Sequence, residues 1–278
     1  MGSLWSAIDA RICTLGRFVT KNVEYTLRVL LMVYLAMRAA VLDQAQGFRT
    51  IVSVISAQIY FTGWQALPLV SVMALATGSV VVLQSMANLS LLGGTQMIGN
   101  FLIVMIVREA GPLLVALVVI ARSGTAVASE IGNMRANREI EALESMGINP
   151  LSFIVFPRVL GGVISVVCLA FYFNILSLIG GFFITKFLQD MPFSFYLDSL
   201  MSGFAKEDVL IFFAKNSFSG MIIFVVSCYQ GLSVKKSPHE VPQVTTQAVV
   251  NSVIYVIVFN LTVTTLFYLN QLQRLGVV

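Results

Sequence analysis

Residues 108–132, "REAGPLLVALVVIARSGTAVASEIG", place ionisable side chains in and beside a run apolar enough to lie in lipid. Arg108 and Glu109 precede the run, and Arg122 and Glu130 come before its end. A charge at the bilayer centre costs about 2.5–3.5 kcal/mol on insertion scales, so such residues are rare and usually functional. The segment therefore predicts a membrane-spanning helix whose function requires buried ions.

The rest of the chain has the composition of an integral membrane protein. Of its 278 residues, 58% are hydrophobic and 11% are charged, far from the balance of a soluble domain. A run of about 20 apolar residues spans a bilayer as a helix. Such runs predict an all-α protein with five transmembrane helices, at residues 64–86, 97–120, 159–185, 216–234 and 246–270. We expect a transmembrane domain over 64–278 and cytoplasmic or interfacial helices over 1–63.

Residues 4–30 predict an amphipathic helix in the plane of the cytoplasmic headgroups. Apolar residues recur there at three- and four-residue steps between charged residues, a pattern typical of interfacial helices. A soluble helix packed on a partner is the alternative. A second stretch, 48–61, could be a cytoplasmic helix or a partly inserted lead-in to the first span.

Basic residues orient the spans, because Lys and Arg are retained in cytoplasmic loops. Twelve lie in segments on the N-terminal side of the membrane and four on the opposite side. This distribution predicts a cytoplasmic N-terminus and an external C-terminus. The net charge of +4 then reflects topology and attraction to anionic lipid, and it does not indicate nucleic-acid binding.

The charges of the second span predict a polar stripe from mid-membrane to the cytoplasm. On one continuous helix, Arg122 and Glu130 would each lie about 40° from Arg108, on opposite sides. Adjacent positions point about 100° apart, so Arg108 and Glu109 need separate partners. A second copy, water and an anionic substrate are possible partners. The intrachain candidates are backbone carbonyls and the amides Gln84, Asn174, Asn251 and Asn260.

The alternative to a polar stripe is structural. Pro112 would break the helix, and Arg108 and Glu109 would lie in a re-entrant turn that ties the fold together. The first span leaves a similar choice. Leu75, Leu83 and Met86 fall near one side of that helix with Gly78 between them, where small residues could leave a groove for an acyl chain or allow close helix packing.

Residues 137–147 predict a short charged helix in the cytoplasmic loop between the second and third spans. Asn137 can cap its start and Gly147 can end it. Such a helix could dock a soluble partner. The sequence shows no combination of nucleophile, histidine and acid typical of a hydrolase, and no GxxxxGK phosphate loop. We therefore expect neither hydrolytic chemistry nor ATP hydrolysis by this chain.

The sequence blocks "REAGP", "ARSGTAVASEIGNMR" and "EIEALESMG", followed by "FPRVLGGVIS", closely resemble in order the signature of MlaE-type permeases. These are membrane subunits of ABC systems that work with MCE-domain proteins in lipid transport. The resemblance implies a permease subunit of an ATP-driven transporter, most often of phospholipid, in the bacterial inner membrane. It implies no catalytic residue, metal or cofactor in this chain.

The resemblance also implies partners. We expect a homodimer, cytoplasmic ATPase subunits that bind ATP and Mg²⁺, a periplasmic MCE-domain protein and often a small STAS-domain protein. The charged stripe stands at the charged positions of the motif, and Leu75, Leu83 and Met86 are our candidates for lipid lining. An ion-coupled carrier and a membrane scaffold for an MCE protein are the alternative classes. The residues expected to couple to the ATPase are Met134, Arg138, Glu139, Glu141, Leu143 and Glu144.

Overall fold

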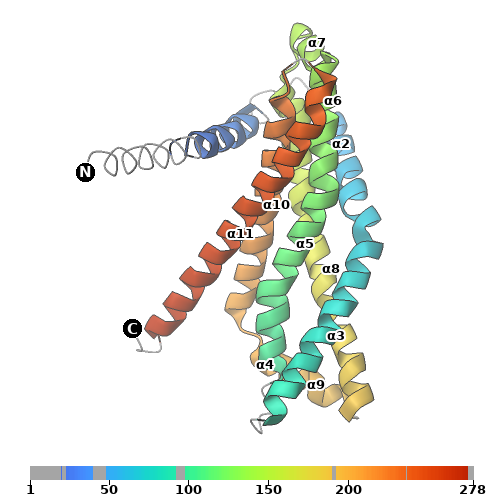
Figure 1. Ribbon diagram of the computed structural model, residues 1–278, viewed down its shortest axis with the longest axis vertical. Helices are drawn as coiled ribbons and strands as arrows, with labels where there is room; N and C mark the ends of the chain where they lie inside the picture. The colour runs from blue at the N-terminus through green and yellow to red at the C-terminus, as the bar shows by residue number, and fades with distance from the viewer. Residues whose placement is uncertain are drawn as a thin grey trace, which may run out of the picture.

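The computed structural model describes residues 20, 23–39, 48–91, 98–189, 192–235 and 237–274, and the regular elements of this part are all helical (Figure 1). A helix over 23–39 comes first. The elements that follow are α2 (Phe48–Thr62), η1 (Trp64–Ala66), α3 (Leu67–Leu91), α4 (Ile98–Leu102), η3 (Ile103–Ala110), α5 (Gly111–Val119), η4 (Ile120–Gly124), α6 (Thr125–Ala136), α7 (Glu139–Ser145), η5 (Leu151–Val155), α8 (Phe156–Gln189), α9 (Phe193–Gly203), α10 (Lys206–Leu232), η6 (Pro238–Glu240) and α11 (Val241–Arg274).

Five described helical stretches are long and apolar enough to cross a membrane, which confirms the expected all-α membrane fold. They are Ile51–Ala87, Gly99–Ala136, Leu151–Leu188, Lys206–Leu232 and Pro238–Gln273. Each extends beyond the predicted apolar run at one end or both. The fourth stretch begins at Lys206 rather than at residue 216, so Lys215, expected in an external loop, lies inside the helix bundle.

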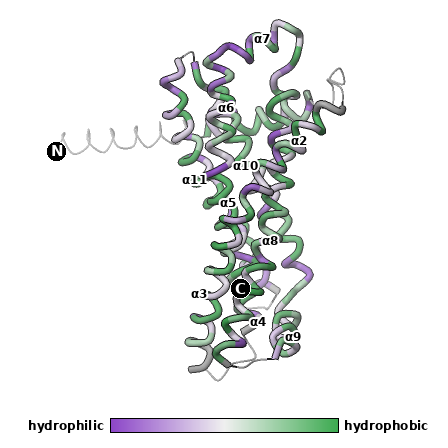
Figure 2. Tube along the Cα trace, turned by 90° about the vertical axis from the view of Figure 1, so that its right-hand side faces the viewer, coloured by the Kyte–Doolittle hydropathy of each residue, from purple (hydrophilic) through white to green (hydrophobic). Residues whose placement is uncertain are grey.

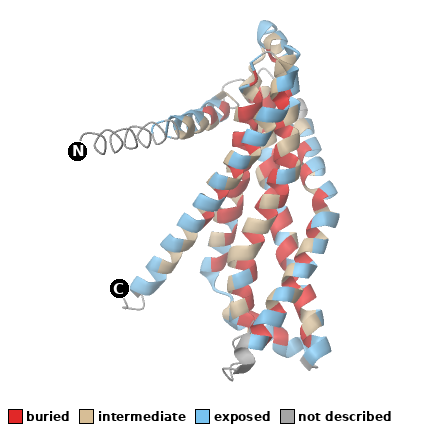
Figure 3. Ribbon diagram, viewed as in Figure 1, coloured by how far each residue is buried: buried red, intermediate tan, exposed pale blue. Residues whose placement is uncertain are grey.

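The centre of the bundle is α8, which packs against α2, α3, α5 and α10, while α10 also packs against α6 and α11. One end of the elongated molecule carries α7, and the other carries α4 and α9 (Figure 1). Hydrophilic residues gather towards the α7 end (Figure 2). Buried residues concentrate where α5, α8 and α10 meet, whereas α11 leans away from the bundle and is largely exposed (Figure 3).

The predicted N-terminal amphipathic helix lies mostly outside the described residues. The described helix over 23–39 projects sideways from the bundle (Figure 1). Tyr25 anchors it, since its ring stacks on Tyr255 at 5.9 Å between centroids and its hydroxyl accepts a hydrogen bond from Gln230 at 3.0 Å. Burial raises the pKa of the Tyr25 phenol above its ordinary value of 10.0.

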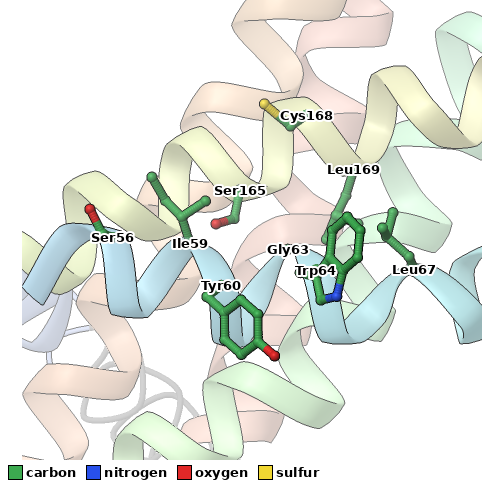
Figure 4. Close-up of a pocket in the computed structure, with 9 residues that line it drawn as sticks. All are labelled: Ser56, Ile59, Tyr60, Gly63, Trp64, Leu67, Ser165, Cys168 and Leu169. Carbon is green, nitrogen blue, oxygen red and sulfur yellow. The ribbon is translucent and has the colours of Figure 1, made fainter.

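The first span bends where α2 passes through η1 into α3. α2 is continuous with this span, so residues 51–62 lead directly into it. Between the bend and α8 lies a mainly apolar groove of about 460 Å³ (Figure 4). Tyr60, Trp64 and Leu67 line one side of the groove, and Ser165, Cys168 and Leu169 of α8 line the other.

The small residues of α3 serve close helix packing. A Cβ on Gly78 would collide with the backbone carbonyl of Ser177 in α8, so these two helices meet at backbone contact distance. Of the lipid-lining candidates, Leu75 and Leu83 are 40% and 46% exposed, but Met86 is only 8% exposed and belongs to the core. None of these three candidates lines the groove in Figure 4.

Gly78→Leu tests this packing. The added side chain would force α3 away from α8, and we expect a loss of about 1–3 kcal/mol or more in unfolding free energy, as for other overpacked cores. The measurement is the thermal unfolding midpoint in detergent. Ala76→Leu, at an exposed position of the same helix, is the matched control. Equal midpoints for the two variants would contradict the close approach.

Candidate functional site

The second span is one helical run in which α-helical and wider π-helical segments alternate. The π segments η3 and η4 flank α5. Pro112 lies in the first turn of α5, and the Gly111 N–H reaches back to the Ile106 carbonyl. The alternative in which Pro112 breaks the helix into a re-entrant turn is therefore wrong. A wide turn accommodates a proline because neighbouring groups can take up the freed backbone carbonyl.

Lys215 of α10 satisfies a backbone carbonyl that Pro112 leaves free. In a regular α-helix residue 112 would donate to the Arg108 carbonyl, but proline has no N–H. The Lys215 Nζ atom instead donates to this carbonyl at 2.7 Å. It also lies 3.2 Å from Glu109 Oε1 and donates to Thr264 Oγ1 of α11 at 2.8 Å. The ammonium thus replaces the missing donor and pairs with Glu109.

The Arg108 guanidinium has its own partner at the start of α10. Arg108 Nε is 2.6 Å from Asp208 Oδ1, in contact but not aligned as a hydrogen bond. The Asp208 side chain is fully buried, and its other oxygen accepts the Ala205 N–H at 2.9 Å. The guanidinium also lies over the Phe267 ring of α11, 5.3 Å from the centroid. One carboxylate therefore caps α10 and holds Arg108.

These contacts correct the expected partners of the charged pair. We expected amides and backbone carbonyls inside the chain, but the ionic partners are Asp208 and Lys215, which the predicted fourth span left outside. The two residues are seven positions apart, about two turns of one helix, so they share a face. A search for charges at that spacing just before the apolar run would have found them. Arg108 also lies nearer the start than the middle of its 38-residue stretch.

The remaining two charges pair with other helices. Arg122 donates to the Phe61 carbonyl and to Gln65 Oε1, both at 2.9 Å, and so holds the bend between α2 and α3. Glu130 accepts from Arg158 of α8 at 2.7 Å. Arg108 faces α10 whereas Arg122 faces α2, because η3 and η4 depart from the uniform 3.6 residues per turn assumed for one stripe.

The predicted loop helix is present as α7 at the end of the molecule (Figure 1). Arg138 takes a left-handed backbone conformation, with φ 61°, in the turn before it, so Asn137 is not its N-cap. Ile140 is buried, and Met134 and Leu143 pack against the core. Arg138, Glu139 and Glu144 are exposed. The coupling candidates thus divide into residues that hold α7 and residues that present its charge.

The family model described as Permease MlaE matches residues 55–266. A probable ABC transporter permease protein of Rickettsia felis is 33% identical over 216 residues, which cover 78% of this chain and 83% of that protein. The intermembrane phospholipid transport system permease protein MlaE of Haemophilus influenzae is 25% identical over 212 residues, which cover 76% of this chain and 81% of that protein.

These matches and the helical fold define a multi-pass membrane permease of the ABC transporter class. The chain belongs to the MlaE permease family. Pairing of Arg108 and Glu109 joins its second, fourth and fifth spans.

The buried pair predicts a specific pattern of stability. Arg108→Met leaves the buried Asp208 carboxylate without its cation, and breaking such a pair costs about 3–5 kcal/mol. Arg108→Met combined with Asp208→Asn should recover most of this loss. Thermal unfolding in detergent measures both. Arg28→Ala, which breaks the exposed pair with Glu24, is the control and should cost about 0–1 kcal/mol. A double variant no more stable than Arg108→Met would contradict direct pairing.

Proposed function

We propose that this chain is the membrane subunit of an ATP-driven phospholipid transporter of the bacterial inner membrane. The observation that carries the proposal is α7, a short acidic helix held at one end of the membrane bundle by buried Ile140. Membership of the MlaE permease family supports it, and so does the similarity to the phospholipid transport permease of Haemophilus influenzae.

In this proposal a separate ATPase subunit docks on α7 from the cytoplasm. The exposed Arg138, Glu139 and Glu144 supply a charged surface for it, and Met134 and Leu143 connect that surface to the bundle core. Glu141 lies 3.7 Å from Arg135 of α6, which links the two helices. ATP and Mg²⁺ bind to the partner, and this chain receives the movement through α7.

A second copy of the chain completes the permease in this proposal. α11 contributes the least buried of the five spans, and only 17% of its most apolar part is buried inside the chain. An apolar row along it, formed by Val250, Ile254, Ile257 and Leu261, is exposed at helical spacing. We assign this row to the partner copy, with Leu75 and Leu83 of α3 as candidates for contact with the acyl chains of the substrate.

The orientation of the chain in the membrane follows from the side on which the ATPase docks. With α7 in the cytoplasm, α4 and α9 lie at the periplasmic end, where an MCE-domain protein would attach. The N-terminus is then cytoplasmic and the C-terminus periplasmic, as the basic residues of the loops favour. The ion pairs around Arg108 and Glu109 hold the second, fourth and fifth spans together. They leave little unpaired charge with which a coupling ion could interact.

The docking is tested by reversing the charge of α7. Glu139→Lys with Glu144→Lys should abolish co-purification of the ATPase and lower ATP hydrolysis by the assembled complex at least tenfold, because about 1.4 kcal/mol of binding energy is a factor of ten. The control is Asp198→Lys in α9, an exposed acid at the opposite end. Unchanged co-purification of the α7 variant would remove the docking surface from the proposal.

A further inference from the structure

A second polar site lies away from the Arg108 network, between α2, α6 and α8. It is a pocket of about 410 Å³, within the range of small-ligand sites. Val54, Ala57 and Val127 give it an apolar side, whereas Glu130 and Arg158 give it paired charges. The formal charge of this pair is zero, which disfavours both a simple anion and a simple cation as occupant.

The ion pair has unused hydrogen-bonding capacity on both partners. Arg158 Nη2 donates to Glu130 Oε1 at 2.7 Å, and the Arg158 side chain is 11% exposed. Its Nη1 atom is buried without a hydrogen-bond partner among the described residues. A buried donor left unpaired costs about 1–3 kcal/mol, so an acceptor that reaches it through a shift of the Arg158 side chain would stabilise it. The Glu130 side chain is 61% exposed, which leaves its carboxylate open to a donor.

The position of the pocket along the helices matches the headgroup region of one leaflet. Glu130 lies about two turns before the end of α6, and Arg158 lies in the first turn of α8. Both ends lead into the polar segment that carries α7 (Figures 1 and 2). At the headgroup level of the membrane, a phospholipid can therefore supply an acceptor, a donor and apolar chains in one molecule.

We propose that this pocket binds the headgroup of a zwitterionic phospholipid that carries a primary amine. The phosphodiester accepts from Arg158, the ammonium donates to Glu130, and the acyl chains follow the apolar side at Val54 and Ala57. A quaternary ammonium has no N–H to donate to Glu130, and a glycerol headgroup has no positive charge. The site requires only that the chain lies in a membrane, so its absence would leave the proposed transport function intact.

Native mass spectrometry of the full chain in detergent tests the site. Dioleoyl phosphatidylethanolamine, phosphatidylcholine and phosphatidylglycerol are added at equal concentrations. We expect about tenfold more retention of the ethanolamine lipid, because one charge-assisted hydrogen bond is worth about a factor of ten or more. Glu130→Gln should remove its preference over the choline lipid. Equal retention of the three lipids by the unaltered chain would overturn the proposal.

Filling the pocket gives an independent check that leaves both charges in place. Ala57→Trp, at an exposed position in the pocket wall, should lower retention of the ethanolamine lipid about tenfold, by the same arithmetic. Its matched control is Ser56→Trp, the exposed neighbour that lines the groove of Figure 4 instead. Undiminished retention by Ala57→Trp would overturn the site.

A soluble ligand with the same headgroup chemistry must also be distinguished from the lipid as the occupant of the pocket. Phosphoethanolamine without acyl chains carries the same acceptor and donor. We expect it to displace the lipid only weakly, because it lacks the apolar contacts at Val54 and Ala57. Displacement as effective as that by the intact lipid would assign the pocket to a soluble phosphoamine and overturn the lipid assignment.

Discussion

The arrangement of the spans depends on one backbone carbonyl. Every backbone polar group inside a bilayer must be satisfied within the protein, and Pro112 leaves the Arg108 carbonyl without its helical donor. Lys215 supplies that donor from α10 and pairs at the same time with Glu109 and Thr264. A single buried ammonium thereby joins the second, fourth and fifth spans, and the adjacent Arg108 and Asp208 pair adds a second tie between α10 and the second span.

The second span also connects the two regions that the transport proposal requires. It runs without a break from the ion pairs near its start to the turn before α7. Along it, Arg122 holds the bend between α2 and α3, and Glu130 holds α8. In the proposed transport function, a displacement at α7 would act on the first, third and fourth spans through this single helix. Close packing of α3 on α8 at Gly78 keeps the first and third spans together as they respond.

The sequence was sufficient for the helices, because apolar runs and their lengths fix spans in lipid. It was also sufficient for α7, whose charged face, buried Ile140 and terminal Gly147 are local signals. It was not sufficient for the partners of Arg108 and Glu109. Asp208 and Lys215 look like loop residues until the helix is known to continue past them, and the π segments that turn Arg122 towards α2 follow from tertiary contacts rather than from residue spacing.

The most direct test of the account is phospholipid movement in liposomes that contain the purified permease. With its ATPase subunit present, we predict movement of a fluorescent phospholipid that requires ATP and stops when either ATP or the ATPase is omitted. An imposed proton or sodium gradient should have no effect in the absence of ATP. Movement driven by such a gradient, with no ATPase present, would contradict the account and identify an ion-coupled carrier.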